Sequence, residues 1–133
     1  MADPKDMQID IMRSQLSRAR GMGSAKSGVA HWWAQRVTAI ALVPLTLWFI
    51  YHLLALGEAP YEAVLAWISG PVSLVLLLTL AGMTFYHMQL GLQVVIEDYI
   101  HDDVKRLIAL LVMKAAAILL AVTAIVSILK IGL

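Results

Sequence analysis

The chain contains no cysteine and few charged residues. Of its 133 residues, 14% are Asp, Glu, Lys or Arg, against about 25% in an ordinary soluble domain. The missing cysteines exclude disulfides, and they exclude thiolate-held zinc or iron–sulfur clusters within this chain. The net charge of +1 gives no signal for a nucleic-acid partner. Any cofactor bound here would therefore need histidine or oxygen ligands.

Long apolar runs take the place of the missing charges, and 61% of the residues are hydrophobic. Residues 37–57 carry no formal charge, and at 1.5 Å per residue they would span about 31 Å, close to the thickness of a hydrocarbon core. Residues 63–96 are also uncharged, which is too long for one simple span. The "SGP" at 69–71 predicts a break, since proline is tolerated in a first helical turn. The third run, 107–129, contains only Lys114.

These runs predict an all-α membrane protein with three transmembrane helices, at about 37–57, 71–96 and 107–131. The three-helix membrane domain would cover residues 31–133. A short N-terminal arm at 1–30 would precede it, and the sequence of this arm is compatible with either an interfacial helix or a flexible tail that docks on a partner.

Basic residues predict which way the chain crosses the membrane. Six of them precede the first span: Lys5, Arg13, Arg18, Arg20, Lys26 and Arg36. The loop at 57–62 has no basic residue, whereas the loop at 97–106 has two. Because positive charge favours the cytoplasmic side, we expect the N-terminus inside and the C-terminus outside. The polar stretches 31–36 and 97–106 would then lie at the same membrane surface.

His87 is the most unusual residue of the second apolar run. It precedes Glu97 by ten residues, which places it about 15 Å from the boundary and near the bilayer midplane. A histidine at that depth faces a cofactor or forms a hydrogen bond within the bundle. Gly91 lies one turn further along and would leave room for a flat macrocycle, although glycine is also a common packing residue in membrane helices. Haem, which needs one or two axial ligands, suits a lone histidine better than zinc does.

Two blocks of sequence resemble a known family. They are "SGVAHWWAQRVTAIAL" at 27–42 and "HMQLGLQVVIEDY" at 87–99. With the three spans and the short arm, they are similar to the small cytochrome b membrane-anchor subunits of succinate dehydrogenase, respiratory complex II. The resemblance implies half of a two-subunit haem-binding bundle in a bacterial inner membrane. It also implies three protein partners: a larger cytochrome b anchor subunit, an iron–sulfur subunit and a flavoprotein subunit.

The resemblance further implies haem b as a shared cofactor and ubiquinone as the substrate reduced beside this subunit. The site residues implied are His87 as haem axial ligand, Tyr99 as hydrogen-bond donor to the quinone, Asp98 in the quinone pocket, Arg36 at a haem propionate or the quinone pocket, and His31 at a propionate. Helix geometry adds Gly91, which would pack on the haem. The second axial ligand is expected from the larger anchor subunit rather than from His52. The chain alone would be a non-catalytic anchor of an oxidoreductase.

Two alternative functions fit the same residues. A fumarate reductase anchor would serve the same chemistry in reverse. A non-redox helical accessory subunit of a membrane complex would use His87 as an internal hydrogen-bonding group. The presence or absence of haem absorbance in the purified complex separates the redox class from the non-redox class.

Overall fold

The computed structural model describes residues 28–133. It contains α3 (Gly28–Ala55), α4 (Tyr61–Ile68), α5 (Pro71–Tyr99) and α6 (Asp103–Gly132). Three of these helices, α3, α5 and α6, are long and apolar enough to cross a membrane by their length and composition. The predicted fold class, an all-α protein with three membrane spans, is confirmed. The structure of the predicted arm lies outside the described residues, except for its last three positions, which belong to α3.

All three long helices extend beyond the predicted spans. The first helix begins at Gly28 instead of residue 37, and the third begins at Asp103 instead of residue 107. The absence of charge marks only the part of a helix that suits the hydrocarbon core. The hydrogen-bonded backbone continues past it, because Arg and Lys are good helix formers. The 28 residues of α3 are about 42 Å long, more than the membrane core requires.

The short helix α4 is an element that hydropathy did not separate from the second span. Ser69, the C-cap residue that follows Ile68, donates its backbone N–H to the carbonyl of Leu65 at 2.9 Å. Gly70 then has extended backbone angles, and Pro71 is the first residue of α5. The predicted break at 69–71 is therefore present, but the residues before it form a helix of their own.

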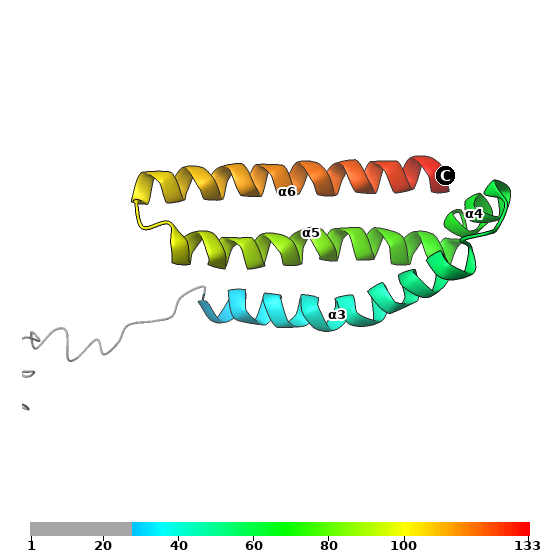
Figure 1. Cartoon of the computed structure of the whole chain (residues 1–133), viewed down its shortest axis with the longest axis horizontal. Helices are drawn as coiled ribbons and strands as arrows, with labels where there is room; N and C mark the ends of the chain where they lie inside the picture. Colours follow the sequence, from blue (N-terminus) through cyan, green and yellow to red (C-terminus); the bar gives the residue numbers. More distant parts are fainter. Residues whose placement is uncertain (1–27) are drawn as a thin grey trace, which may run out of the picture.

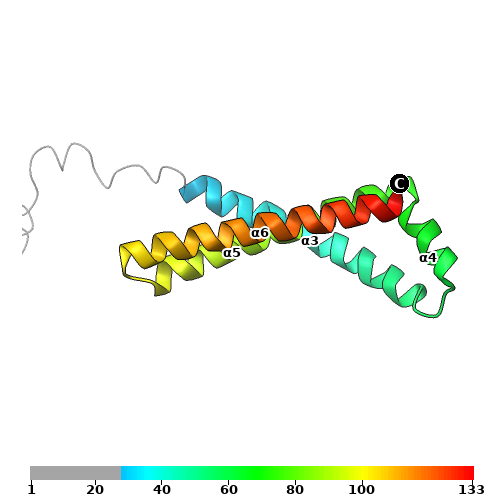
Figure 2. The ribbon, with the colours of Figure 1, turned by 90° about the horizontal axis from the view of Figure 1, so that it is seen from above.

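The three long helices form a single layer with α5 in the middle (Figure 1). α5 packs against both α3 and α6, whereas α3 and α6 make no contact with each other within residues 28–133. α6 runs nearly parallel to the axis of α5, and α3 crosses them obliquely (Figure 2). α3 curves in its second half (Figure 1). The helix contains Pro44, and proline removes a backbone donor and can bend a helix.

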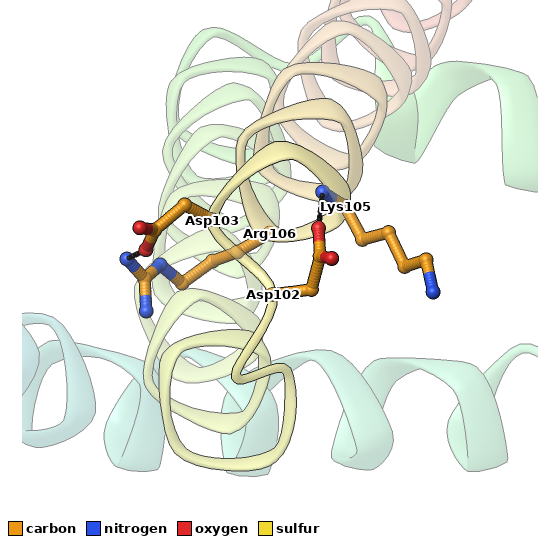
Figure 3. A network of polar contacts seen from close by, with 4 residues as sticks. All are labelled: Asp102, Asp103, Lys105 and Arg106. Carbon is orange, nitrogen blue, oxygen red and sulfur yellow. Dashed lines mark hydrogen bonds and ion pairs between the residues drawn. The ribbon is translucent and has the colours of Figure 1, made fainter.

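A tight turn at residues 100–102 joins α5 to α6 (Figure 3). Asp102 caps α6, since its Oδ1 accepts the backbone N–H of Lys105 at 2.9 Å. Arg106 pairs with Asp103 one turn into the same helix. The cap satisfies one of the backbone N–H groups at the start of α6, so α6 begins directly after this turn.

Few side chains are buried. Among the described residues the buried apolar side chains are Leu77, Leu90 and Ala117, and the buried polar one is Thr38. Large apolar side chains are exposed along all three long helices, for example Ile40, Val75 and Leu119. Both faces of this layer are therefore apolar surfaces that suit lipid or other membrane subunits.

Candidate functional site

The imidazole of His87 lies at the interface of α3 and α5. The antiparallel course of the two helices places Thr38 beside it, 49 residues away in the sequence. The Nδ1 atom of His87 is 2.8 Å from the hydroxyl oxygen of Thr38, and Thr38 is only 4% exposed. His87 itself is half-buried. It therefore faces the neighbouring helix and not the lipid.

The second ring nitrogen of His87 contacts Gln35. The amide Nε2 of Gln35 lies 3.4 Å from Nε2 of His87, a distance beyond the usual range for a strong hydrogen bond. The amide oxygen of Gln35 is buried, and no hydrogen-bond partner for it occurs in the described part of the chain. A Cβ atom added to Gly91 would meet the Gln35 amide at 3.6 Å, so Gly91 faces Gln35 at this interface.

His31 lies on the same face of α3 as Gln35 and Thr38, and it lines an open groove between α3 and α5. The groove has a volume of about 470 Å³, and its walls come from the start of α3 and the second half of α5. Its polar lining comes from His31, Tyr86, Gln93 and Glu97, with Gln93 donating to Glu97 at 2.8 Å. The Nε2 atom of His31 is buried and has no hydrogen-bond partner among residues 28–133.

The residues 31–36 and 97–99 lie at the same end of the molecule (Figure 1), because α3 begins where α5 ends. Their shared location agrees with the prediction that both stretches meet at one surface. The groove joins them directly, since it is lined by His31 from one stretch and Glu97 from the other.

Arg36 points away from this interface. Two residues along a helix turn the side chain by about 200°, so Arg36 lies opposite Thr38 on α3. Its guanidinium stands 5.4 Å from the ring centroid of Trp32, a cation–π contact. Among the described residues, Arg36 has no hydrogen bond or ion pair to Asp98 or Tyr99.

Asp98 and Tyr99 form the last turn of α5, and both are exposed. The side chain of Tyr99 is 80% exposed. Tyr99 follows Glu97 by two residues, a rotation of about 200° around the helix axis. It therefore lies on the side of α5 opposite the groove. The helix end therefore presents two polar surfaces, one with Glu97 and one with Tyr99.

His52 belongs to a different cluster, near the other end of α3. Its Nδ1 atom is 2.9 Å from the carbonyl oxygen of Trp48, and its ring stacks on Trp67 of α4. The indole rings of Trp48 and Trp67 are 5.6 Å apart. The aromatic rings around His52 place it in a packed junction between α3 and α4.

Sequence reasoning named His31, His87 and Gly91 but missed Gln35 and Thr38. A signal for them was present: His31, Gln35 and Thr38 recur at i, i+4 and i+7, which places three polar side chains on one face of an otherwise apolar helix. This stripe faces α5 in the structure.

The fold and the site define a class of protein: a multi-pass helical membrane subunit with a histidine at an interhelical contact and a layer that is open on both faces. Comparison with known proteins makes the class specific. Residues 10–127 match the family described as succinate dehydrogenase/fumarate reductase transmembrane subunit. The chain belongs to this family.

Curated relatives agree with the family match. The succinate dehydrogenase hydrophobic membrane anchor subunit of Rickettsia bellii is 39% identical over 116 residues, covering 87% of this chain and 93% of the relative. The subunit of the same name from Rickettsia typhi is 32% identical over the same shares. That from Paracoccus denitrificans is 34% identical over 66% of this chain and 68% of the relative. No solved structure matches the chain. The resemblance to succinate dehydrogenase membrane anchors is confirmed, and it covers most of the chain.

Proposed function

We propose that this anchor subunit supplies His87 as an axial ligand to a haem b shared with a partner anchor subunit, and that its Tyr99 end forms part of a ubiquinone-reduction site. The observation that carries the haem proposal is the contact between His87 Nδ1 and Thr38. Metal-binding histidines nearly always engage their second nitrogen in a hydrogen bond of this kind. The other nitrogen of His87 has only the long contact with Gln35.

The residues around His87 fit a haem. Iron at Nε2 would replace the 3.4 Å contact with Gln35, which is the weakest of the local hydrogen bonds. Two buried polar atoms nearby, His31 Nε2 and Gln35 Oε1, have no partner in the described part of the chain. Each unpaired buried atom costs about 1–3 kcal/mol, so a polar group brought to this interface would stabilise it. His31 at a propionate would satisfy one of them.

A haem bound here would supply one-electron redox chemistry. The chain's own part is to orient one imidazole, to keep the surroundings apolar, and to provide polar side chains near the membrane surface. Gly91 leaves space at the interface into which Gln35 now extends. Ala34 and Leu90 also line the adjacent groove.

The quinone proposal depends on the position of Tyr99. A quinone is soluble in lipid, and its two-electron reduction also takes up two protons. It therefore needs a hydrogen-bond donor close to water at the edge of the membrane. Tyr99 and Asp98 are exposed at the last turn of a membrane-spanning helix, which suits such a role. Arg36 faces away from α5, so it would take part in this pocket only if a partner subunit extends the pocket to that side of α3.

The open layer supports the proposed partners. The chain buries only three apolar side chains among its described residues, and α3 and α6 do not contact each other there. A larger cytochrome b anchor subunit would cover part of the exposed apolar surface. An iron–sulfur subunit, supplied with electrons by a flavoprotein subunit, would dock at the end that carries Tyr99. We propose that this end faces the cytoplasm of a bacterial cell.

A non-redox accessory role has one observation in its favour, since both nitrogens of His87 already have partners within the chain. Absorbance spectroscopy of the purified complex separates the two. A reduced-minus-oxidised difference spectrum with b-type bands, altered in His87→Ala, supports the redox role. A stable, colourless complex would support the accessory role instead.

A further inference from the structure

We propose that Thr38 is a positioning residue for His87, which holds the imidazole in the tautomer with a proton on Nδ1 and a free lone pair on Nε2. Its purpose rests on the haem function proposed above, but the hydrogen bond itself follows from the geometry of this chain. Thr38 was not among the residues that the sequence motifs indicated.

The contacts of the Thr38 hydroxyl decide where its proton lies. Its oxygen is 2.7 Å from the carbonyl of Ala34, 3.2 Å from the carbonyl of Gln35 and 2.8 Å from Nδ1 of His87. A hydroxyl has one proton, and a carbonyl can only accept. The proton therefore points to Ala34 at the shortest distance, and a lone pair of the hydroxyl accepts from Nδ1–H of His87.

The contact of the second ring nitrogen agrees with this assignment. The amide nitrogen of Gln35 can only donate, and it faces Nε2 of His87. In a neutral imidazole with its proton on Nδ1, Nε2 is an acceptor, so each contact pairs one donor with one acceptor. With the Gln35 amide in this orientation, the opposite tautomer would place two donors facing each other at Nε2.

Because Thr38 is buried, water cannot readily take the place of its hydroxyl as the partner of His87. With Thr38 4% exposed, a water molecule from the membrane surface has little access to Nδ1. Iron binds a neutral imidazole through its lone pair, and a hydrogen bond at the other nitrogen fixes the ring orientation and raises ligand basicity. The strength of the bond between iron and the imidazole would thereby depend on how α3, which carries Thr38, packs against α5.

The first test uses the purified complex with three variants. Thr38→Val keeps the shape of the side chain and removes the hydroxyl, and Thr38→Ser keeps the hydroxyl. Thr46→Val is a matched control, because Thr46 donates to Leu42 at 2.7 Å with a second carbonyl at 3.1 Å in the same helix but has no contact with His87. The control separates loss of the imidazole contact from loss of an intrahelical bond.

Thr38→Val should weaken haem binding by about 10–100-fold, the range typical of lost partners of metal ligands. The haem midpoint potential should rise, because a less basic imidazole stabilises the ferric state less. Thr38→Ser and Thr46→Val should resemble the wild type. Unchanged affinity and potential in Thr38→Val would overturn the role of Thr38 while leaving the haem proposal intact.

A second measurement needs no Thr38 variant, so it can be made even if the Thr38 variants fail to assemble. In wild-type complex labelled with ¹⁵N-histidine, prepared with and without haem, the His87 signals are assigned by their loss in His87→Ala. Nδ1 should be protonated in both forms. An unprotonated Nδ1 in the haem-free form would overturn the proposal. If His87→Ala keeps an unaltered haem spectrum, the haem function itself fails, and the state of Nδ1 still decides whether the hydrogen bond exists.

Discussion

The ring of His52 stacks on the indole of Trp67, with centroids 5.2 Å apart and planes inclined by 23°. This contact ties the end of α3 to α4, far from His87. Thr38, which contacts His87, precedes His52 by fourteen residues in α3, a rise of about 21 Å along a helix. The two histidines are too far apart to bind the same iron atom. His52 instead packs at the junction of α3 and α4.

This separation gives opposite expectations for the two histidines. His87→Ala should alter the haem spectrum and lower haem occupancy in the purified complex. His52→Ala should leave the spectrum unchanged, although it removes the stacking on Trp67. Absorbance and redox titration of both variants provide the measurement. Identical spectra for His87→Ala and wild type would contradict haem ligation by this chain.

Tyr99→Phe tests the quinone role. The substitution removes one hydroxyl and retains the ring, so folding should hold. A buried partner left unpaired costs about 1–3 kcal/mol, and each 1.36 kcal/mol of barrier is about tenfold in rate. Quinone reduction should therefore fall roughly tenfold, while succinate oxidation with an artificial acceptor that bypasses the quinone stays near wild type.

Tyr61→Phe is the matched control for Tyr99→Phe. Tyr61 is also largely exposed, at 71%, but it begins α4 at the opposite end of the molecule. Both activities should remain unchanged in this control. If the ratio of the two activities in Tyr99→Phe equals that of the wild type, Tyr99 does not contact the quinone.

Orientation in the membrane can be tested with reporter fusions in the bacterial inner membrane. A reporter inserted in the turn at 100–102 should be active only as a cytoplasmic enzyme. One fused after Leu133 should be active only outside the cytoplasm, because α6 separates the two points. The expectation follows from the six basic residues that precede the first span, since positive charge favours the cytoplasmic side. A cytoplasmically active C-terminal fusion would show that the orientation is inverted.

The cap of α6 predicts a stability effect without a change in chemistry. Asp102→Ala removes the acceptor of the Lys105 backbone N–H and should destabilise the helix start by about 0.5–2 kcal/mol. Asp102→Asn keeps an acceptor and should cost much less. The thermal unfolding midpoint of the complex in detergent measures both. Equal midpoints for Ala and Asn would mean that the cap contributes little once the partners are bound.

The sequence by itself determined the membrane class, the three spans and the break at 69–71. Each of these depends on local properties, namely the length of an uncharged run and the effect of proline on a helix. It also indicated His87, since a histidine deep in an apolar run is energetically unusual. The helix ends were less predictable, because hydropathy changes at the membrane surface whereas backbone hydrogen bonding continues beyond it.

Only the tertiary structure decided which groups meet. Thr38 and His87 are 49 residues apart, and their contact depends on how α3 rotates and shifts against α5. A polar stripe on α3 indicates a face, but it does not reveal which residue of another helix that face will meet. The outward direction of Arg36 likewise follows from the rotation of α3, which is set by close packing of Thr38 and Gln35 against α5. Interhelical packing depends on the fit of whole surfaces, and that information is absent from any single stretch of sequence.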